Sequence, residues 1–140
     1  MPIETHKIQV ESEGNNQVVD ITPRLIDTLN HADISNGVAT LFVLGSTAGI
    51  TTTEYEPGLV NHDLKDCFDR IAPEKGRYEH EKTWQDDNGH SHLRASLLGP
   101  SLTVPIQDCK PTLGTWQQIV LIDFDTRPRQ RHIVVQLIGE

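Results

Sequence analysis

The order of apolar and polar positions along the chain predicts mostly strands. Residues 3–11 and 17–21 carry strand-forming residues on either side of the polar turn Ser-Glu-Gly-Asn-Asn. Residues 37–45 are apolar almost throughout, which is typical of a strand that is buried on both faces. The Thr-rich residues 45–55 are predicted to form a turn and a further strand. The remaining strand predictions are 90–98, 101–106, 118–125 and 132–138.

Two segments have the features of helices instead. Thr22-Pro23 fits a helix start, with Thr as the cap and Pro at the first helical position. From residue 59 the apolar positions recur with a helical period until Pro73. Residues 72–89 are polar and are expected to form an ordered loop. The sequence therefore predicts one α+β domain, residues 1–140, with a mostly antiparallel sheet or sandwich and two main helices.

Length and charge exclude several classes of protein. A chain of 140 residues can bury a core as a single domain, and a net charge of -8 disfavours a nucleic-acid-binding surface. No apolar stretch approaches the roughly 20 residues that span a bilayer, and no signal segment is expected. We therefore expect a cytoplasmic protein with no membrane or nucleic-acid partner. A disulfide between Cys67 and Cys109 is the less favoured alternative to two reduced thiols.

The main candidate for chemistry lies in residues 90–98. If this segment is a strand, its odd-numbered residues form an apolar face, and His90, His92, Arg94 and Ser96 share the polar face. Residues two apart on one face of a strand are about 6.5–7 Å apart. Their imidazoles could then meet on one metal ion.

A metal site needs at least a third ligand, and His80 precedes the loop that leads to this segment. Asp86, Asp87 or a water could complete the shell. The sequence thus predicts a divalent-metal site, most simply for Zn²⁺, with His80, His90 and His92 as ligands. The alternative is a solvated outer face whose histidines bind metal only opportunistically.

The same region resembles a known family. The runs GRYEH, DDNGHSHLRASLLGPSLTVP, LGTWQQIVLIDFD and VVQLIGE are similar to those of the YjbQ family of uncharacterised proteins, and the resemblance covers nearly the whole chain. It implies a compact α+β fold, assembly as a homotrimer, and a secondary thiamine-phosphate synthase activity. It also implies that the metal ligands are His80, His90 and His92.

One position departs from the family pattern. Many members have His-Thr-Ser-Ala where this chain has the run GSTAG, so Gly45 stands in the place of that histidine. Ser46, Thr47 or a water would have to replace it. This difference puts an unchanged transfer of activity to this chain in doubt.

Several other residues are candidates for an enzyme site. Arg94 would neutralise anionic charge, Ser96 and Thr47 would donate hydrogen bonds, and Glu54 would move a proton. A solvated carboxylate at a strand end is an equally good interpretation of Glu54.

Further candidates lie towards the end of the chain. Thr115 and Gln117, with Arg94, are candidate substrate-binding residues, although Trp116 between the first two is more ordinarily a core or interface residue. The arginines of residues 127–131 could hold a phosphate, but a solvated hairpin or an ion-pair network between subunits is favoured.

These observations favour an enzyme that acts on a small phosphorylated metabolite with a bound divalent metal. The reaction would be a thiamine-phosphate synthase-like transfer or a metal-dependent hydrolysis. The alternative is a non-catalytic homotrimer that binds a metal or an anion. In either case, we expect the site to lie near a subunit boundary.

Overall fold

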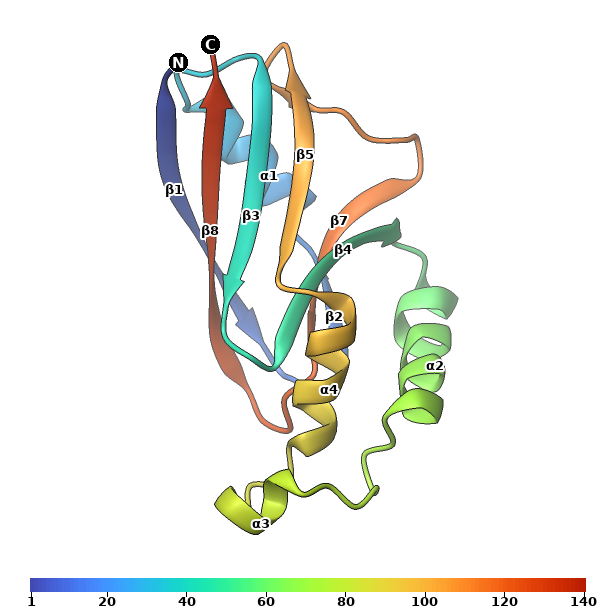
Figure 1. Cartoon of the computed structure of the whole chain (residues 1–140). Helices are drawn as coiled ribbons and strands as arrows, with labels where there is room; N and C mark the ends of the chain where they lie inside the picture. Colours follow the sequence, from blue (N-terminus) through green and yellow to red (C-terminus); the bar gives the residue numbers. More distant parts are fainter.

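Two antiparallel sheets curl around a shared core in the computed structural model, which describes all residues 1–140 (Figure 1). One sheet has five strands in the order β1-β8-β3-β5-β6, and the other has three in the order β2-β7-β4. The strands are β1 (Ile3–Ser12), β2 (Gln17–Asp20), β3 (Gly37–Leu44), β4 (Ala48–Glu54), β5 (Ser101–Gln107), β6 (Lys110–Pro111), β7 (Gln117–Asp123) and β8 (Arg129–Gly139). The α+β class and the antiparallel sheets are confirmed.

The five-stranded sheet buries one face only. Along β3, Leu41 and Val43 are buried in the core, whereas Phe42 and Leu44 between them are 44% and 49% exposed. The prediction that this strand is buried on both faces is therefore wrong for the single chain. The alternation leaves an apolar strip on the outer surface of the sheet.

The first helix, α1 (Thr22–Asn30), begins at the predicted Thr-Pro pair and buries Leu25 and Leu29 against the core. Its start is stabilised differently from the prediction. The Thr22 hydroxyl does not cap the helix but accepts a hydrogen bond from the Ile119 amide at 2.8 Å. The side chain of Asp20 accepts the Thr22 amide instead, at 3.0 Å. The helix is thereby tied to β7.

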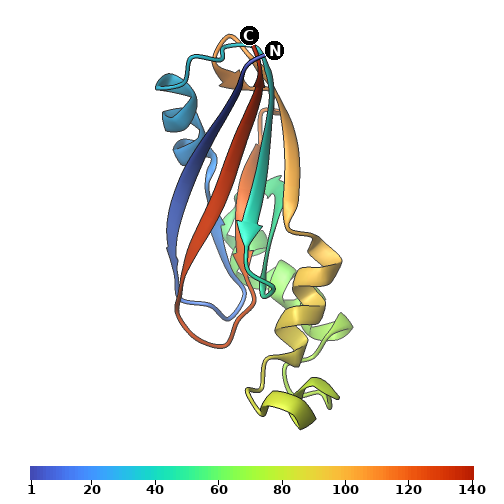
Figure 2. The same cartoon turned by 60° about the vertical axis from the view of Figure 1, so that its left-hand side comes forward.

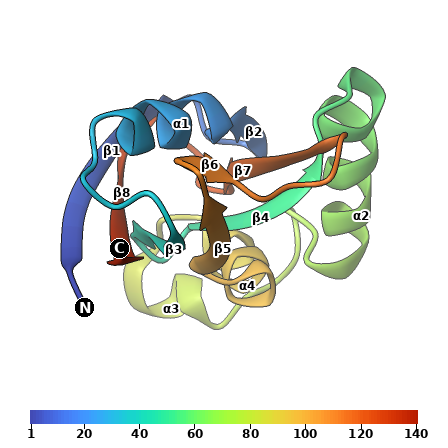
Figure 3. The same cartoon turned by 90° about the horizontal axis from the view of Figure 1, so that it is seen from above.

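The second predicted helical segment is confirmed as a π-helical turn, η1 (Leu59–Asp63), that continues into α2 (Leu64–Ile71). It ends before Pro73, as expected from its sequence. Phe68 of α2 packs edge-to-face on Phe124 with ring centroids 4.8 Å apart. Figure 3 shows α2 lying beside β4 and β7, on the opposite side of the molecule from β1.

The prediction of a strand at residues 90–98 is wrong. This segment is helix α4 (Gly89–Leu98), which follows the short helix α3 (His80–Trp84). Its buried residues Ser91, Arg94 and Ala95 recur at the three- and four-residue intervals of a helix, and α4 as a whole packs against β4. The alternation of apolar and polar residues in this segment fits a strand as well as a helix. The helix forms because it buries one face of the segment against the rest of the chain.

Helices α3 and α4 extend the molecule at the end of the sheets that lies away from both termini (Figures 1 and 2). Gly99, with a φ of 94°, ends α4 and turns the chain into β5. Both cysteines are free thiols. None of the helices has the length and apolar character needed to cross a membrane.

Candidate functional site

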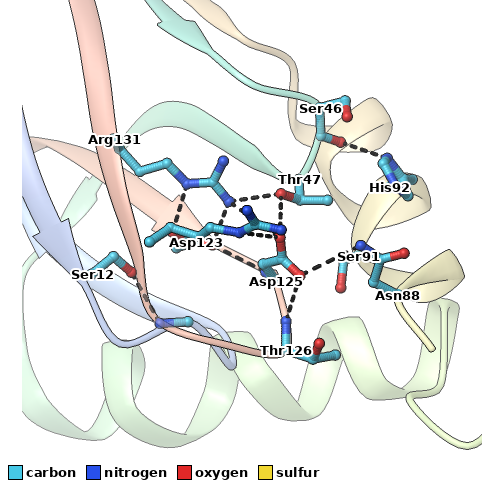
Figure 4. A network of polar contacts seen from close by, with 12 residues as sticks. Ser12, Ser46, Thr47, Asn88, Ser91, His92, Asp123, Asp125, Thr126 and Arg131 are labelled. Atoms are coloured by element: carbon cyan, nitrogen blue, oxygen red, sulfur yellow. Dashed lines mark hydrogen bonds and ion pairs between the residues drawn. The ribbon is translucent and has the colours of Figure 1, made fainter. Parts of the chain in front are cut away.

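A buried network of charged side chains lies where β4, β7 and β8 meet α4 (Figure 4). Asp123 and Arg131 are almost fully buried, and Arg131 donates from Nε and Nη2 to the two carboxylate oxygens of Asp123 at 2.7 and 2.8 Å. The same Nη2 donates to the hydroxyl of Thr47 at 2.7 Å. That hydroxyl in turn donates to Asp125 Oδ2 at 3.1 Å. Thr47 therefore connects Asp125 to the ion pair of Asp123 and Arg131.

Asp125 is held as a carboxylate by its surroundings. Burial raises its pKa, but hydrogen bonds from the Thr126 amide and the Thr47 hydroxyl, together with the Arg129 guanidinium, outweigh burial, and the net pKa is lowered. Asn88, at the start of α4, donates to the other carboxylate oxygen at 3.5 Å. Asp125 thus joins β7 to the segment that carries the histidines.

His92 is oriented by a backbone group of the turn between β3 and β4. Its Nδ1 lies 3.1 Å from the carbonyl oxygen of Ser46. Because a carbonyl oxygen can only accept, Nδ1 must carry the hydrogen, and in the neutral ring the lone pair is on Nε2. Figure 4 shows the imidazole reaching from α4 towards Ser46. His92 is therefore fixed in the tautomer whose Nε2 can accept a proton or bind a metal.

His80 lies next to His92, with ring centroids 4.6 Å apart. Its Nδ1 is 3.4 Å from Asp86 Oδ1, but the two atoms do not have hydrogen-bond geometry. Each of the two imidazoles therefore has an oxygen near Nδ1. This arrangement is typical of histidines whose Nε2 acts on a ligand or a metal.

His90 is separated from this pair. Two residues apart on a helix corresponds to a rotation of about 200°, so the shared face expected from a strand does not exist. The His90 side chain is buried near Tyr78, and its Nδ1 has no hydrogen-bond partner. Burial, assisted by the charge of Arg94, lowers the pKa of His90. The structure therefore brings together His80 and His92 and leaves His90 out.

The chain by itself does not assemble the predicted metal site. No group of three or more His, Cys, Asp or Glu side chains is placed to hold an ion. A structural zinc site has four protein ligands, and a catalytic one has three. His80 and His92 supply two.

Arg94 and Ser96, which were expected to contact an anionic substrate, bind groups of the protein itself. Arg94 donates to the carbonyl of Ala72 at 3.0 Å, to Asp69 at 2.6 Å and to Asn16 at 3.4 Å. Ser96 donates to the His92 carbonyl within the helix at 2.7 Å. Arg94 therefore connects α4 to α2, and its donors are directed at the protein.

The remaining candidates lie at the far end of the three-stranded sheet. Glu54 pairs with Gln117 in the register of β4 and β7, whereas Thr47 precedes the other end of β4. A strand of this length spans about 20 Å. The Gln117 side chain is bound internally, to Thr52 and to the Gly114 amide. Within one chain, Thr47 is near the histidine pair, and Glu54, Thr115 and Gln117 are not.

Sequence reasoning missed the buried carboxylates, although a signal was present. Asp123 and Asp125 are two apart at the end of an apolar strand, and Arg129 and Arg131 are two apart where the next strand begins. Residues with this spacing point to the same face. The sequence favours a solvated hairpin or an ion-pair network between subunits for the arginines, whereas the structure shows Arg129 and Arg131 in ion pairs within one chain.

The fold and these contacts define an α+β protein of two antiparallel sheets with a buried ion-pair network beside a histidine pair. The family model described as "UPF0047 protein YjbQ-like" matches residues 6–140. The chain therefore belongs to the YjbQ family, and the resemblance found in the sequence is confirmed.

The relatives support this assignment over the whole length. The UPF0047 protein of Methanocaldococcus jannaschii is 35% identical over 96% of this chain and 94% of its own. The UPF0047 protein YugU of Bacillus subtilis is 30% identical over 94% and 97%. A YbjQ-like protein of unknown function from Sulfolobus solfataricus has a TM-score of 0.87 at 31% identity, covering 99% of this chain and 100% of that one. A hypothetical protein from Aeropyrum pernix has a TM-score of 0.90 at 29% identity, covering 98% and 99%.

Proposed function

We propose that the protein is a cytoplasmic enzyme that acts on a small phosphorylated metabolite, with His92 as the acid–base group. The observation that carries the proposal is the hydrogen bond from His92 Nδ1 to the Ser46 carbonyl, which leaves Nε2 as a proton acceptor. His80 provides a second imidazole, whose ring centroid lies 4.6 Å from that of His92. The buried network around Thr47 supports the turn that orients His92.

Two reaction types fit such a centre. In a hydrolysis, His92 Nε2 would take a proton from a water that attacks phosphorus, and the imidazolium would return a proton to the leaving oxygen. In a transfer like that of thiamine-phosphate synthase, which the family resemblance suggests, pyrophosphate leaves a pyrimidine methylene carbon as a thiazole nitrogen attacks it. There the imidazolium would hydrogen-bond to the departing anion. Both reactions need a bound phosphate group.

A divalent metal is a second proposal, and the proximity of His80 and His92 favours it. Two imidazoles with oxygens near each Nδ1 resemble part of a metal site, but two ligands are too few. Metal binding would need a donor from the substrate or from another subunit. A metal such as Zn²⁺ would supply a Lewis acid, and His92 would then be a ligand and not the acid–base group.

The test is a screen of small phosphomonoesters and pyrophosphates for phosphate or pyrophosphate release. His92→Gln should lower turnover at least about a hundredfold, which is the usual contribution of a general acid–base group. His62→Gln, an exposed histidine on η1, is the matched control and should keep full activity. Equal turnover in the two variants would show that His92 has no part in the reaction.

A further inference from the structure

The buried side chain of Arg131 has unused hydrogen-bond donors. A guanidinium has five N–H groups. Three of them are used, by Nε towards Asp123 and by Nη2 towards Asp123 and Thr47. The two on Nη1 have no partner within the chain, although the side chain is only 7% exposed. Figure 4 shows one terminal nitrogen of Arg131 turned away from both carboxylates.

Gly45 provides the space next to Nη1. A Cβ added at Gly45 would lie 2.6 Å from Nη1, which is too close for any side chain unless the arginine moves. Gly45 has a φ of 141°, a conformation that favours glycine. The absence of a side chain at this position therefore leaves Nη1 beside an open, exposed stretch of backbone.

The turn that follows Gly45 adds further donors. None of the amide groups of Gly45, Ser46 and Thr47 donates a hydrogen bond to another backbone group. Successive free amides in a turn are a common way to bind anions. A cavity of about 150 Å³ opens beside the turn; Arg131 does not line it, and its lining residues are Gly45, Ser46, Ala48, Ala95, Ser96 and Pro100.

The local charge balance shapes what can bind here. Arg131 and Arg129 are offset by Asp123 and Asp125, so the network has no net positive charge. An anion would be held by directed N–H groups and not by a general positive field. This arrangement favours a compact oxyanion that accepts several hydrogen bonds at once, such as a phosphate group.

We propose that Arg131 Nη1 and the amides of residues 45–47 form an oxyanion-binding subsite for the phosphate group of the substrate. This inference rests on the proposed function, because it places the phosphate beside the Ser46 carbonyl that orients His92. The donors lie on β8 and on the turn between β3 and β4. Arg94, the anion-binding residue expected from the sequence, is directed at Asp69 and Ala72 instead.

The experiment is a calorimetric titration of the whole protein with inorganic phosphate at low ionic strength. Arg131→Lys keeps a charge for Asp123 but removes Nη1, and Gly45→Ala places a methyl group 2.6 Å from Nη1, which forces the arginine to move. Each variant should weaken phosphate binding at least about tenfold. Gly99→Ala is the matched control, because Gly99 also has a positive φ but a Cβ there meets nothing within 4 Å. It should bind phosphate like the unchanged protein.

Circular dichroism and the melting temperature establish whether each variant is folded. If Arg131→Lys does not fold, Gly45→Ala is the decisive variant. Unchanged affinity in the folded variants, or no saturable binding by the unchanged protein, would overturn the inference. His92→Gln should bind phosphate within about threefold of the unchanged protein, since its imidazole is not one of the proposed donors. Loss of turnover without loss of phosphate binding thus tests the acid–base role separately from the anion subsite.

Discussion

Arg94 on α4 and Asp69 on α2 form an ion pair of 2.6 Å that joins the two helices. The Arg94 side chain is only 4% exposed, and it also holds the Ala72 carbonyl at the end of α2. Burying a guanidinium is costly unless it is paired with a carboxylate and hydrogen-bonded, and Arg94 has both kinds of contact. The contact therefore fixes α4, and with it His92, relative to the rest of the chain.

Replacing Arg94 by Met should lower the free energy of unfolding by about 2–3 kcal/mol, because Asp69 and the Ala72 carbonyl lose their partner. The matched control is Arg70→Met, which removes an exposed ion pair with Asp66 on the same helix and should cost less than about 1 kcal/mol. Urea unfolding followed by circular dichroism gives both values. Equal losses would mean that the buried pair contributes no more than the surface pair.

His90 should make the fold sensitive to mild acid. Burial lowers its folded pKa, so below the unfolded value of about 6.5 the unfolded chain binds a proton that the folded chain resists. The free energy of unfolding should therefore fall as the pH drops from about 6.5 towards the folded pKa. Arg94 strengthens this effect, while Glu74 and Glu81 oppose it.

The measurement is the slope of unfolding free energy against pH between 5 and 7, compared between the unchanged protein and His90→Gln. The variant should have the shallower slope, whatever its absolute stability. His31→Gln, which removes an exposed histidine just after α1, serves as the control, and the slope should change less in it than in His90→Gln. A slope that is the same in the His90 variant would show that this side chain does not titrate differently on folding.

Metal binding, if it occurs, should depend on His80 and His92 but not on His90. The first two rings are neighbours, whereas His90 is buried elsewhere. Zn²⁺ affinity should fall strongly in His80→Ala and His92→Ala, because each variant removes one of the two imidazole ligands. Metal content after identical purification, measured by mass spectrometry, distinguishes them from His90→Ala and from His132→Ala on β8. Full stoichiometric metal in His92→Ala would place the site elsewhere.

Much of the fold could be predicted because its elements have clear periods. Strands β1, β3 and β8 alternate or are continuously apolar, and α2 repeats its apolar residues every three or four positions. Residues 90–98 could not be assigned in this way. Their alternation suits a strand, and the helix is decided by burial of Ser91, Arg94 and Ala95, which depends on packing against β4.

The candidate site was predictable only in part, because it too depends on tertiary packing. His80 and His92 come from two helices, and their proximity follows from how α3 and α4 fold back on each other. No spacing in the sequence specifies that approach. The free Nη1 of Arg131 depends on three hydrogen bonds that the other nitrogens make to Asp123 and Thr47, and on the missing side chain of Gly45. Unpartnered donors of this kind follow from the tertiary hydrogen bonds, which the sequence does not specify.

The exposed apolar strip on β3 should be a contact between subunits. Phe42 and Leu44 are 44% and 49% exposed on the outer face of the five-stranded sheet, and Phe42 is paired with the half-buried Val134 of β8. Contiguous exposed apolar side chains are typical of interfaces, and the family resemblance suggests a homotrimer.

Light scattering of the unchanged protein should give three times the chain mass of 15.7 kDa. Phe42→Glu should shift this towards the monomer, because a carboxylate is costly to bury in an interface. Leu97→Glu, at an apolar position on α4 that is 62% exposed, should leave the mass unchanged. A concentration-independent monomer for the unchanged protein would rule out the assembly.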